Sequence, residues 1–241
     1  MSIVQPTARL GVILFSGNRP LEPYFRALAP EQLAIHITRM QMGSGGQRAR
    51  DEIQADAVRS AELLAEAKVD VIDLQATGIM MERGPAGEAE VVKAITAATG
   101  IPAYTATQAV MEAMRALGIK RVIQVNPGSD AAISREKSYL EAEGFNVVHS
   151  IGLDSGRATF EVEPADWLEA AKANDRPAGD GFFLSGSNTR MLEAIADIEQ
   201  ATGKPAVTSI QAALWAGVQR LAPTLGVVRS PPDLGRLFAA A

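Results

Sequence analysis

The chain carries one pattern of residues twice. Three segments recur in the same order: 11–18 with 121–128, 70–78 with 180–188, and 98–109 with 201–212. The first two pairs are offset by 110 positions and the third by 103. Such a repeat constrains the fold more than any other feature, because each copy is expected to form an equivalent structural unit. We therefore expect two equivalent lobes that face each other, with one site between them.

Composition and charge narrow the function classes. The 241 residues are 47% apolar and 21% charged, as is usual for a well-packed globular protein. The net charge of −5, without a cluster of Lys or Arg, gives no reason to expect nucleic acid or a membrane surface as a partner. No apolar run reaches the roughly 18 residues of a membrane span. Because residues 1–6 show neither a basic nor an apolar leader pattern, we expect a cytoplasmic location.

Two residue types restrict the chemistry further. The chain has no cysteine, which excludes disulfides, thiolate metal sites and cysteine nucleophiles. Its two histidines, His36 and His149, are too few for a histidine-rich metal site. We expect both to be structural residues of strands rather than bases, and we predict no metal site.

Short apolar runs alternate with Ala-, Leu- and Glu-rich stretches, which predicts an α/β fold with parallel sheets. The predicted strands are 10–15, 33–39, 69–74, 103–104, 121–125, 146–150, 181–184 and 206–208. The predicted helices are 47–66, 86–99, 107–117, 131–143, 164–173, 189–202 and 210–221. Glycines follow four of these helices, where a positive φ is favoured: Gly100, Gly118, Gly144 and Gly203.

We predict two Rossmann-like lobes related by a pseudo-twofold axis, each with a parallel four-stranded sheet flanked by helices. The first lobe is expected to span residues 1–117 and to be completed by residues 212–241. The second lobe is expected to span residues 118–211, with the active-site cleft between the two. The sequence leaves assembly into a homo-oligomer open.

Four small, polar segments follow predicted strands, where ligands bind in open α/β sheets. They are 16–18, 75–78, 126–129 and 185–188. Backbone N–H groups and hydroxyls at such turns suit a carboxylate, whose oxygens accept several hydrogen bonds. No P-loop or GxGxxG pattern is present, so the sequence gives little support to phosphate or dinucleotide binding. The glycine-rich segment 39–47, with Met40 and Met42, is either a flap over the site or an ordinary surface loop.

Four stretches carry a resemblance to a known family. They are Arg-Leu-Gly-Val-Ile-Leu-Phe-Ser-Gly-Asn-Arg-Pro-Leu-Glu at 9–22, Thr77 directly after a predicted strand, Met-Arg-Ala-Leu-Gly-Ile-Lys-Arg-Val at 114–122, and Phe-Leu-Ser at 183–185. In these stretches the chain resembles the aspartate/glutamate racemase superfamily. Within it, the chain is most similar to the branch of maleate isomerases, arylmalonate decarboxylases and ectoine-utilisation proteins.

The resemblance implies an enzyme that works without a cofactor and places one cysteine on each lobe to move protons or add to the substrate. In this chain Ala76 stands where the first cysteine is expected, and Gly186 stands where the second is expected. A tyrosine that contacts the substrate carboxylate is expected near Gly128, and a serine at Gly78. The thiol half of the site is therefore absent.

The binding half of the site is retained in the resemblance. Asn18 matches a carboxylate-binding asparagine of maleate isomerases, although a turn-forming asparagine is the alternative. Thr77 and the loop backbones are also kept. We predict that a small carboxylate substrate contacts the following residues: Ser16, Asn18, Thr77, Gly78, Asn126, Gly128 and Asn188.

Other groups are candidates for the missing acid/base function. Asp73 lies in an apolar strand, where desolvation raises a carboxyl pKa, but a buried aspartate that caps a helix is the alternative. Glu82 follows Thr77 in a predicted loop and either reaches the cleft or is solvated. Asp130 is either an acid/base group or, more simply, a helix N-cap. Ser187, with Asn188, is a candidate donor to an oxyanion.

The remaining conspicuous side chains have simpler interpretations. Trp167 and Trp215 lie in helical patterns and are expected to pack in the core. Gln108 and Gln211 recur in the repeat before helical runs and are expected to bond to backbone.

The main hypothesis is a cofactor-independent isomerase or decarboxylase-type lyase that acts on a small mono- or dicarboxylate. An enolate-like intermediate would be held by Thr77, Ser187, Asn188 and loop N–H groups. Racemisation by two thiols is excluded, because neither lobe supplies a thiolate. The alternatives are a hydrolase or lyase that uses a carboxylate or bound water, and a non-catalytic binder of small carboxylates. The sequence is also compatible with a protein whose cysteines were replaced by small residues.

Overall fold

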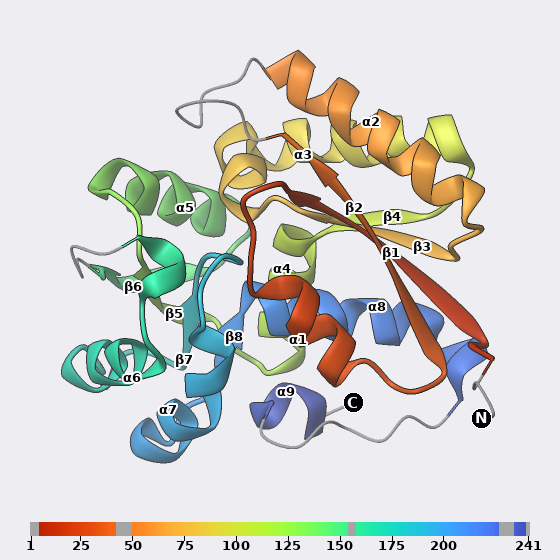
Figure 1. Cartoon of the computed structure of the whole chain (residues 1–241). Helices are drawn as coiled ribbons and strands as arrows, with labels where there is room; N and C mark the ends of the chain where they lie inside the picture. Colours follow the sequence, from red (N-terminus) through yellow and green to blue (C-terminus); the bar gives the residue numbers. More distant parts are fainter. Residues whose placement is uncertain (1–4, 42–49, 154–157, 227–233, 240–241) are drawn as a thin grey trace.

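In the part of the chain that the structure describes, eight parallel strands form two sheets of identical topology (Figure 1). The computed structural model describes residues 5–41, 50–153, 158–226 and 234–239. The first sheet has the order β2-β1-β3-β4 and the second has the order β6-β5-β7-β8. The predicted fold class, two parallel four-stranded sheets flanked by helices, is confirmed.

The strands are close to those predicted. They are β1 Ala8–Phe15, β2 Leu33–Met40, β3 Val71–Gln75, β4 Ala103–Thr105, β5 Arg121–Asn126, β6 Asn146–Gly152, β7 Gly181–Leu184 and β8 Ala206–Thr208. The α-helices are α1 Leu21–Leu28, α2 Arg50–Glu66, α3 Thr77–Thr99, α4 Ala106–Ala116, α5 Asp130–Ala142, α6 Pro164–Ala173, α7 Ile195–Thr202, α8 Ser209–Leu225 and α9 Gly235–Ala239. Short 3₁₀ helices span Thr159–Glu161 and Met191–Ala194.

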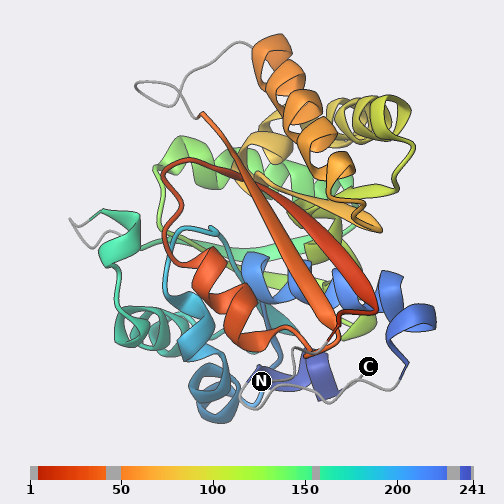
Figure 2. The same ribbon diagram turned by 45° about the vertical axis from the view of Figure 1, so that its right-hand side comes forward.

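Helices cover both faces of the first sheet, as a buried parallel sheet requires. Figures 1 and 2 show α2 and α3 on one face of the first sheet and α1 and α8 on the other. Helices α4 and α8 pack against each other, and both contact β3 of the first sheet and β8 of the second. This helix pair therefore lies between the sheets, and its buried side chains belong to one core that extends through both halves. The predicted packing of Trp167 fits this core, since the side chain is fully buried.

The repeat is visible in individual hydrogen bonds. At the start of α4, the Thr105 side chain accepts the N–H of Gln108, and the Gln108 side chain accepts the N–H of Thr105. At the start of α8, Thr208 and Gln211 make the same reciprocal pair of bonds. Such capping boxes satisfy helix N–H groups that have no partner within the helix. The expectation that both glutamines bond to backbone is confirmed.

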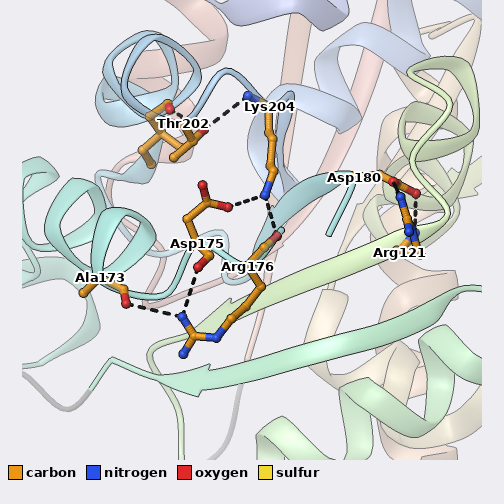
Figure 3. Close-up of polar contacts among 8 residues, drawn as sticks. Arg121, Ala173, Asp175, Arg176, Asp180, Thr202 and Lys204 are labelled. Carbon is orange, nitrogen blue, oxygen red and sulfur yellow. Dashed lines mark hydrogen bonds and ion pairs between the residues drawn. The ribbon is translucent and has the colours of Figure 1, made fainter. Parts of the chain in front are cut away.

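A second repeated contact lies where the strands begin. The Asp70 carboxylate accepts the backbone N–H of Arg9 at 2.7 Å, and the Asp180 carboxylate accepts the backbone N–H of Arg121 at 2.9 Å. In the second half the Arg121 guanidinium also donates to Asp180, as Figure 3 shows. Lys204 lies near this pair and bonds to Asp175 and to the carbonyl of Arg176. These contacts fix the ends of the sheets opposite to the strand ends that face the site.

Strand register corrects one predicted correspondence. In the first sheet Leu10 pairs with Val71, and in the second Val122 pairs with Gly181. The equivalence of Val71 and Gly181 keeps the predicted offset of 110, but β1 and β5 then correspond at an offset of 112. A shift of two residues keeps each side chain on its predicted face of the sheet. It escaped the sequence comparison because both strands are apolar runs with the same alternation.

Several element boundaries also differ from prediction. The residues directly after β3, predicted as a loop, open α3 at Thr77, so Glu82 is a helical residue. The helix is broken at Gly84, which has a φ of 74° and is followed by Pro85. This break obscured the helical pattern in the sequence. Ser129 caps α5 rather than Asp130, which is the first helical residue. Helices α1 and α9 were not predicted.

The four glycines predicted to follow helices have φ values between 70° and 88°, as expected. The lobe boundaries at residues 117 and 211 stay a prediction. Helix α8 packs against β1 and β3 of the first sheet, which is compatible with the chain returning to the first lobe. Within the described residues, no helix combines the length and apolar character needed to cross a membrane.

Candidate functional site

A cavity of about 380 Å³ lies where the carboxyl ends of β3, β5 and β7 meet the first turns of α3 and α5. Its walls come from both halves of the repeat: Phe15, Gln75, Ala76, Thr77, Gly78, Ile79 and Glu82 from the first, and Asn126, Pro127, Gly128, Ala132, Arg135, Glu136, Thr159, Ser185, Gly186, Ser187, Asn188 and Thr189 from the second. Parallel α/β sheets bind ligands at such strand ends. Most of the predicted site residues are thus brought together, while Ser16, Asn18 and Asp73 are not among the lining residues.

The first-lobe wall is the amino end of α3. The N-cap residue is Ala76, which has no side chain that can accept a helix N–H, and the first backbone bond of the helix runs from Met80 to Ala76. The N–H groups of Thr77, Gly78 and Ile79 therefore have no partner within the helix. The Thr77 hydroxyl is buried and also lacks a hydrogen-bond partner. Free N–H groups at a helix amino terminus favour an anion.

The two small residues of this wall leave space. Ala76 has φ −143°, outside the positive-φ range that favours glycine. A Cβ placed on Gly78 would find no atom within 4 Å. The first lobe therefore has room for the cysteine and the serine that the family resemblance leads one to expect at these positions.

The second-lobe wall is built differently. Gly186 has φ +106°, a conformation that residues with a Cβ rarely adopt. A Cβ on Gly128 would lie 2.8 Å from the Asn126 Oδ1, and that oxygen accepts the Gly128 N–H at 2.5 Å. The backbone at Gly186 therefore favours glycine, and at Gly128 a larger residue would have to displace the Asn126 side chain.

Asn18 joins the two lobes. Its Nδ2 donates to the Ser187 carbonyl at 2.9 Å and to the Ser187 hydroxyl at 3.2 Å, and its Oδ1 accepts the N–H of Leu21. Beside it, the backbone N–H of Arg19 donates to the Asn188 Oδ1 at 3.1 Å. In this arrangement the Asn18 amide holds the loop 185–189 against the first lobe instead of facing the cavity.

Glu136 is the site residue that the sequence analysis missed. It lies on α5, is 4% exposed, and lines the cavity. Its carboxyl group accepts hydrogen bonds from Ser185 Oγ at 2.6 Å, Asn126 Nδ2 at 2.5 Å and Gln124 Nε2 at 3.0 Å. Burial raises its pKa above the ordinary value of a glutamate, although the three donors act in the opposite direction. The signal in the sequence was an acid on the buried stripe of a helix, three residues after Ile133 and three before Tyr139.

Asp73 is fully buried behind this cavity. Burial raises its pKa to about 7, while the hydrogen bond from Gln75 and the more distant charge of Arg220 lower it. Gln75 Nε2 donates to Asp73 Oδ2 at 2.5 Å, and Asp73 Oδ1 has no partner. Only Gln75 of this pair reaches the cavity wall. A role for Asp73 in proton transfer would therefore have to pass through Gln75.

The predicted acid Glu82 lies at the cavity mouth. Its carboxylate is 3.8 Å from the Arg135 guanidinium, and both side chains are about half exposed, at 53% and 49%. A solvated ion pair of this kind contributes little to stability. Within the described residues, no group of three His, Cys, Asp or Glu side chains is placed to hold a metal ion.

The histidines and the predicted flap lie elsewhere. His36 is in β2, and His149 in β6 bonds to Asn174 at 3.2 Å. Met40 is a buried residue at the end of β2, packed against the core. Residues 42–47 of the predicted flap, including Met42, lie outside the described residues, whereas Arg39 and Met40 belong to β2.

Comparisons with known proteins agree with this architecture. A protein-family model described as arylmalonate decarboxylase matches residues 17–238. The arylmalonate decarboxylase of Bordetella bronchiseptica is 31% identical over 201 residues, 82% of each chain. The maleate isomerase of Pseudomonas putida is 27% identical over 228 residues, 88% of this chain and 91% of its own.

Solved structures give the same result. A crystal structure of arylmalonate decarboxylase has a TM-score of 0.83 at 27% identity and covers 97% of this chain and 100% of its own. The maleate isomerase of Pseudomonas putida S16 has a TM-score of 0.85 at 25% identity and covers 97% of this chain and 99% of its own. The relatives are enzymes, and the similarity extends over nearly the whole chain.

Proposed function

The chain belongs to the arylmalonate decarboxylase family, and from that premise we propose that it is a cofactor-independent lyase or isomerase acting on a small mono- or dicarboxylate. The reaction would pass through an enolate-like intermediate, as the removal of CO₂ or of a proton next to a carboxylate requires. One observation carries the proposal. The uncapped amino end of α3, with the unpartnered Thr77 hydroxyl, lines the same cavity as the buried carboxyl group of Glu136.

The amino end of α3 supplies the binding half of the reaction. A substrate carboxylate placed there would accept hydrogen bonds from the N–H groups of Thr77, Gly78 and Ile79 and from the Thr77 hydroxyl. Negative charge that develops on the same oxygens would be stabilised more strongly than the charge of the ground state, because the donors are fixed before the reaction begins. Ser187 and Asn188 line the opposite wall, where their remaining hydrogen-bonding capacity is open to a ligand.

The chain must move protons without a thiol. Ala76 and Gly186 occupy the two positions where the family resemblance predicts cysteines, so a carboxyl group has to take their place. A buried carboxyl with a raised pKa retains its proton closer to neutral pH than a solvated one, which suits a general acid. Glu136 meets this condition on the cavity wall, and Asp73 meets it one side chain further back.

The emptied cysteine positions favour a second candidate, a non-catalytic binder of small carboxylates. Such a protein would keep the α3 anion site and would need no proton donor. The same cavity would then bind the ligand without converting it.

Turnover and binding assays separate these candidates. Purified protein is incubated with an arylmalonate such as phenylmalonate and with maleate, with and without a chelator, and products are followed by chromatography. Binding of the same acids is measured by calorimetry. The enzyme proposal expects a chelator-insensitive conversion of at least one acid or of a close analogue in the same class.

Thr77→Val is the matched control, because it keeps the side-chain shape and removes the hydroxyl. We expect it to weaken binding of the acid or its conversion by about tenfold, the effect of one hydrogen bond to a charged group. Binding without conversion would identify the binder. If no small carboxylate of either class binds, or if Thr77→Val binds as tightly as the wild type, the proposed site is wrong.

A further inference from the structure

The two oxygens of the Glu136 carboxyl group have different neighbours. Oε2 accepts two amide donors, Asn126 Nδ2 at 2.5 Å and Gln124 Nε2 at 3.0 Å. Among the described residues, Oε1 accepts the hydroxyl of Ser185 alone, at 2.6 Å. Ser185 is the last residue before Gly186, and both Ser185 and Glu136 line the cavity.

The amide orientations are set by their other partners. Asn126 Oδ1 accepts the backbone N–H of Gly128, which can only donate, so Asn126 must present its NH₂ group to Glu136. Gln124 Oε1 accepts the Ser150 hydroxyl at 3.1 Å, which favours the same orientation for that amide. Two N–H donors therefore occupy Oε2, and neither can accept a proton from it.

A proton on Glu136 has one position left. It must reside on Oε1, where its hydrogen-bond partner is the Ser185 oxygen. A hydroxyl can accept and donate at once, so Ser185 then turns its own hydrogen away from Glu136. The remaining open side of Ser185 is the cavity that it lines.

We propose that Ser185 and Glu136 form a proton relay. Ser185 is the catalytic residue that exchanges a proton with the substrate carbon. Glu136 orients the Ser185 hydroxyl and returns a proton to it. This inference rests on the proposed function and names the group that replaces the missing second-lobe thiol. In a decarboxylation, the C–CO₂ bond breaks, CO₂ leaves, and the electron pair enters the enolate-like intermediate held by the first lobe. The carbon then takes the Ser185 hydroxyl proton while Ser185 takes the proton of Glu136. Water reprotonates Glu136 and closes the cycle.

Three other acids are buried among the described residues, and they lack this geometry. Glu199 accepts the backbone N–H groups of Ala206 and Arg236 and does not line the cavity. Glu88 accepts hydrogen bonds from Thr105 and Tyr139 and does not line the cavity. Asp73 has only Gln75 between it and the cavity, and an amide does not relay a proton as a hydroxyl does.

The electrostatic surroundings of Glu136 support the relay. Its pKa is raised mainly by burial, and Arg135 on the same helix lowers it slightly. Glu82 of α3 lies across the mouth against Arg135, while the neighbours from β5 and β7 are uncharged. Because the relay needs protonated Glu136, its ionisation is expected to dominate the alkaline limb of the pH profile, where kcat falls as pH rises.

The test compares Ser185→Ala, Ser185→Thr and Glu136→Gln with the wild type on phenylmalonate and maleate. We expect Ser185→Ala and Glu136→Gln to lower kcat by about 10²- to 10⁴-fold, the usual contribution of a general acid. KM is expected to change by no more than a few fold, because the α3 anion site is untouched. Ser185→Thr keeps the hydroxyl and is expected to recover part of kcat. Glu136→Gln should also remove the ionisation that Glu136 contributes to the kcat–pH profile.

Glu88→Gln is the matched control, since it neutralises a buried carboxyl that does not reach the cavity and should leave the profile unchanged. The relay is wrong if Ser185→Ala or Glu136→Gln keeps the wild-type kcat and pH profile. A wild type that converts no acid contradicts the proposed function instead. In that case the relay is judged by a ¹³C NMR titration of the Glu136 carboxyl. A midpoint above the ordinary glutamate range that moves in Ser185→Ala supports the Oε1 hydrogen bond, and an unmoved midpoint overturns it.

Discussion

The two lobes have lost side chains in different ways. In the first lobe, Ala76 has a negative φ of −143° and a Cβ on Gly78 would meet no atom within 4 Å, so neither position is restricted to glycine. In the second lobe, the positive φ of Gly186, +106°, favours glycine, and a Cβ at Gly128 would press against the Asn126 side chain. The two halves of the repeat therefore share one topology but differ in whether these positions accept a larger side chain.

The asymmetry shows that the loops of the second lobe have conformations that suit the glycines they contain. A cysteine replaced by a small residue would leave a backbone with negative φ, as at Ala76. The Gly186 backbone is instead one that glycine favours, and the Gly128 turn holds the Asn126 amide that donates to Glu136. The second-lobe glycines and the Glu136 network thus belong to one arrangement.

Two buried carboxyl groups, one in each lobe, also differ in how many hydrogen-bond donors they accept. Glu136 of the second lobe accepts three side-chain donors, whereas Asp73 of the first accepts one and leaves Oδ1 without a partner. Removing each acid should therefore have opposite effects on stability.

The largest effect is expected from Asp73→Asn, and its sign depends on pH. The folded-state pKa of about 7 lies above the unfolded value of 3.8, so folding holds a proton that the unfolded chain releases. Stability is then lost as pH rises from 3.8 to about 7, and the full cost above pH 7 is about 4 kcal/mol. Asn cannot ionise, so the variant should gain stability over the wild type at pH 8 and gain less at pH 5.

Urea unfolding at the two pH values measures this gain. The control is Asp180→Asn, whose pKa is lowered to about 2 by Arg121. That carboxylate stabilises the fold above its unfolded pKa, so its removal should lower stability at pH 8. A gain for Asp73→Asn that is equal at both pH values would show that Asp73 does not titrate in this range.

Glu136→Ala should have the next largest effect, a loss of about 3 kcal/mol. The substitution leaves the hydroxyl of Ser185 and the amides of Asn126 and Gln124 without their buried acceptor, and an unsatisfied buried donor is costly. Chemical denaturation of Glu136→Ala and Glu136→Gln measures the difference. Gln keeps an acceptor oxygen and should lose clearly less. Equal losses would mean that packing volume, rather than donor satisfaction, makes Glu136 necessary.

Most elements of the fold could be predicted from the sequence, because their patterns are local. All eight strands were predicted, because buried parallel strands are short apolar runs that the repeat presents twice. The glutamine caps were predicted because Thr105-x-x-Gln108 and Thr208-x-x-Gln211 are local patterns. The start of α3 was not, because Gly84 and Pro85 interrupt its helical pattern.

The site was predicted only in part. Loops that follow strands identified both cavity walls, since strand ends of a parallel sheet meet at one edge. The role of Asn18 between lobes depends on how the halves dock, which local sequence does not encode. Glu136 resembled any charged helix residue, because the side chains that bond to it come from β5 and from the residue after β7. The positive φ of Gly186 is likewise a property of the folded loop.

Introducing a cysteine at Ala76 or at Gly186 tests directly whether the two lobes differ in tolerating a larger side chain. Gly186→Cys should lose about 2 kcal/mol, because a Cβ is strained at φ +106° even though its nearest contacts are at 3.5 Å or more. Ala76→Cys should stay within about 0.5 kcal/mol of the wild type, since alanine already places a Cβ at this negative φ. Thermal unfolding measures both, and thiol alkylation reports whether each new side chain reaches the cavity. Equal stabilities would contradict the assignment of Gly186 as a backbone requirement.

The smallest expected difference separates Gly78→Ala from Gly128→Ala. Gly78 lies in the first turn of α3 with open space around it, so alanine should be neutral or slightly stabilising. At Gly128 the new methyl would meet Asn126 Oδ1 at 2.8 Å and the Ala132 methyl at 3.2 Å, which should cost about 1 kcal/mol. The clash displaces the amide that holds Glu136 Oε2, so the carboxyl titration of Glu136 should move in Gly128→Ala and stay in place in Gly78→Ala. A titration that moves in neither variant would separate the glycine turn from the carboxyl network and reduce the lobe asymmetry to a matter of packing.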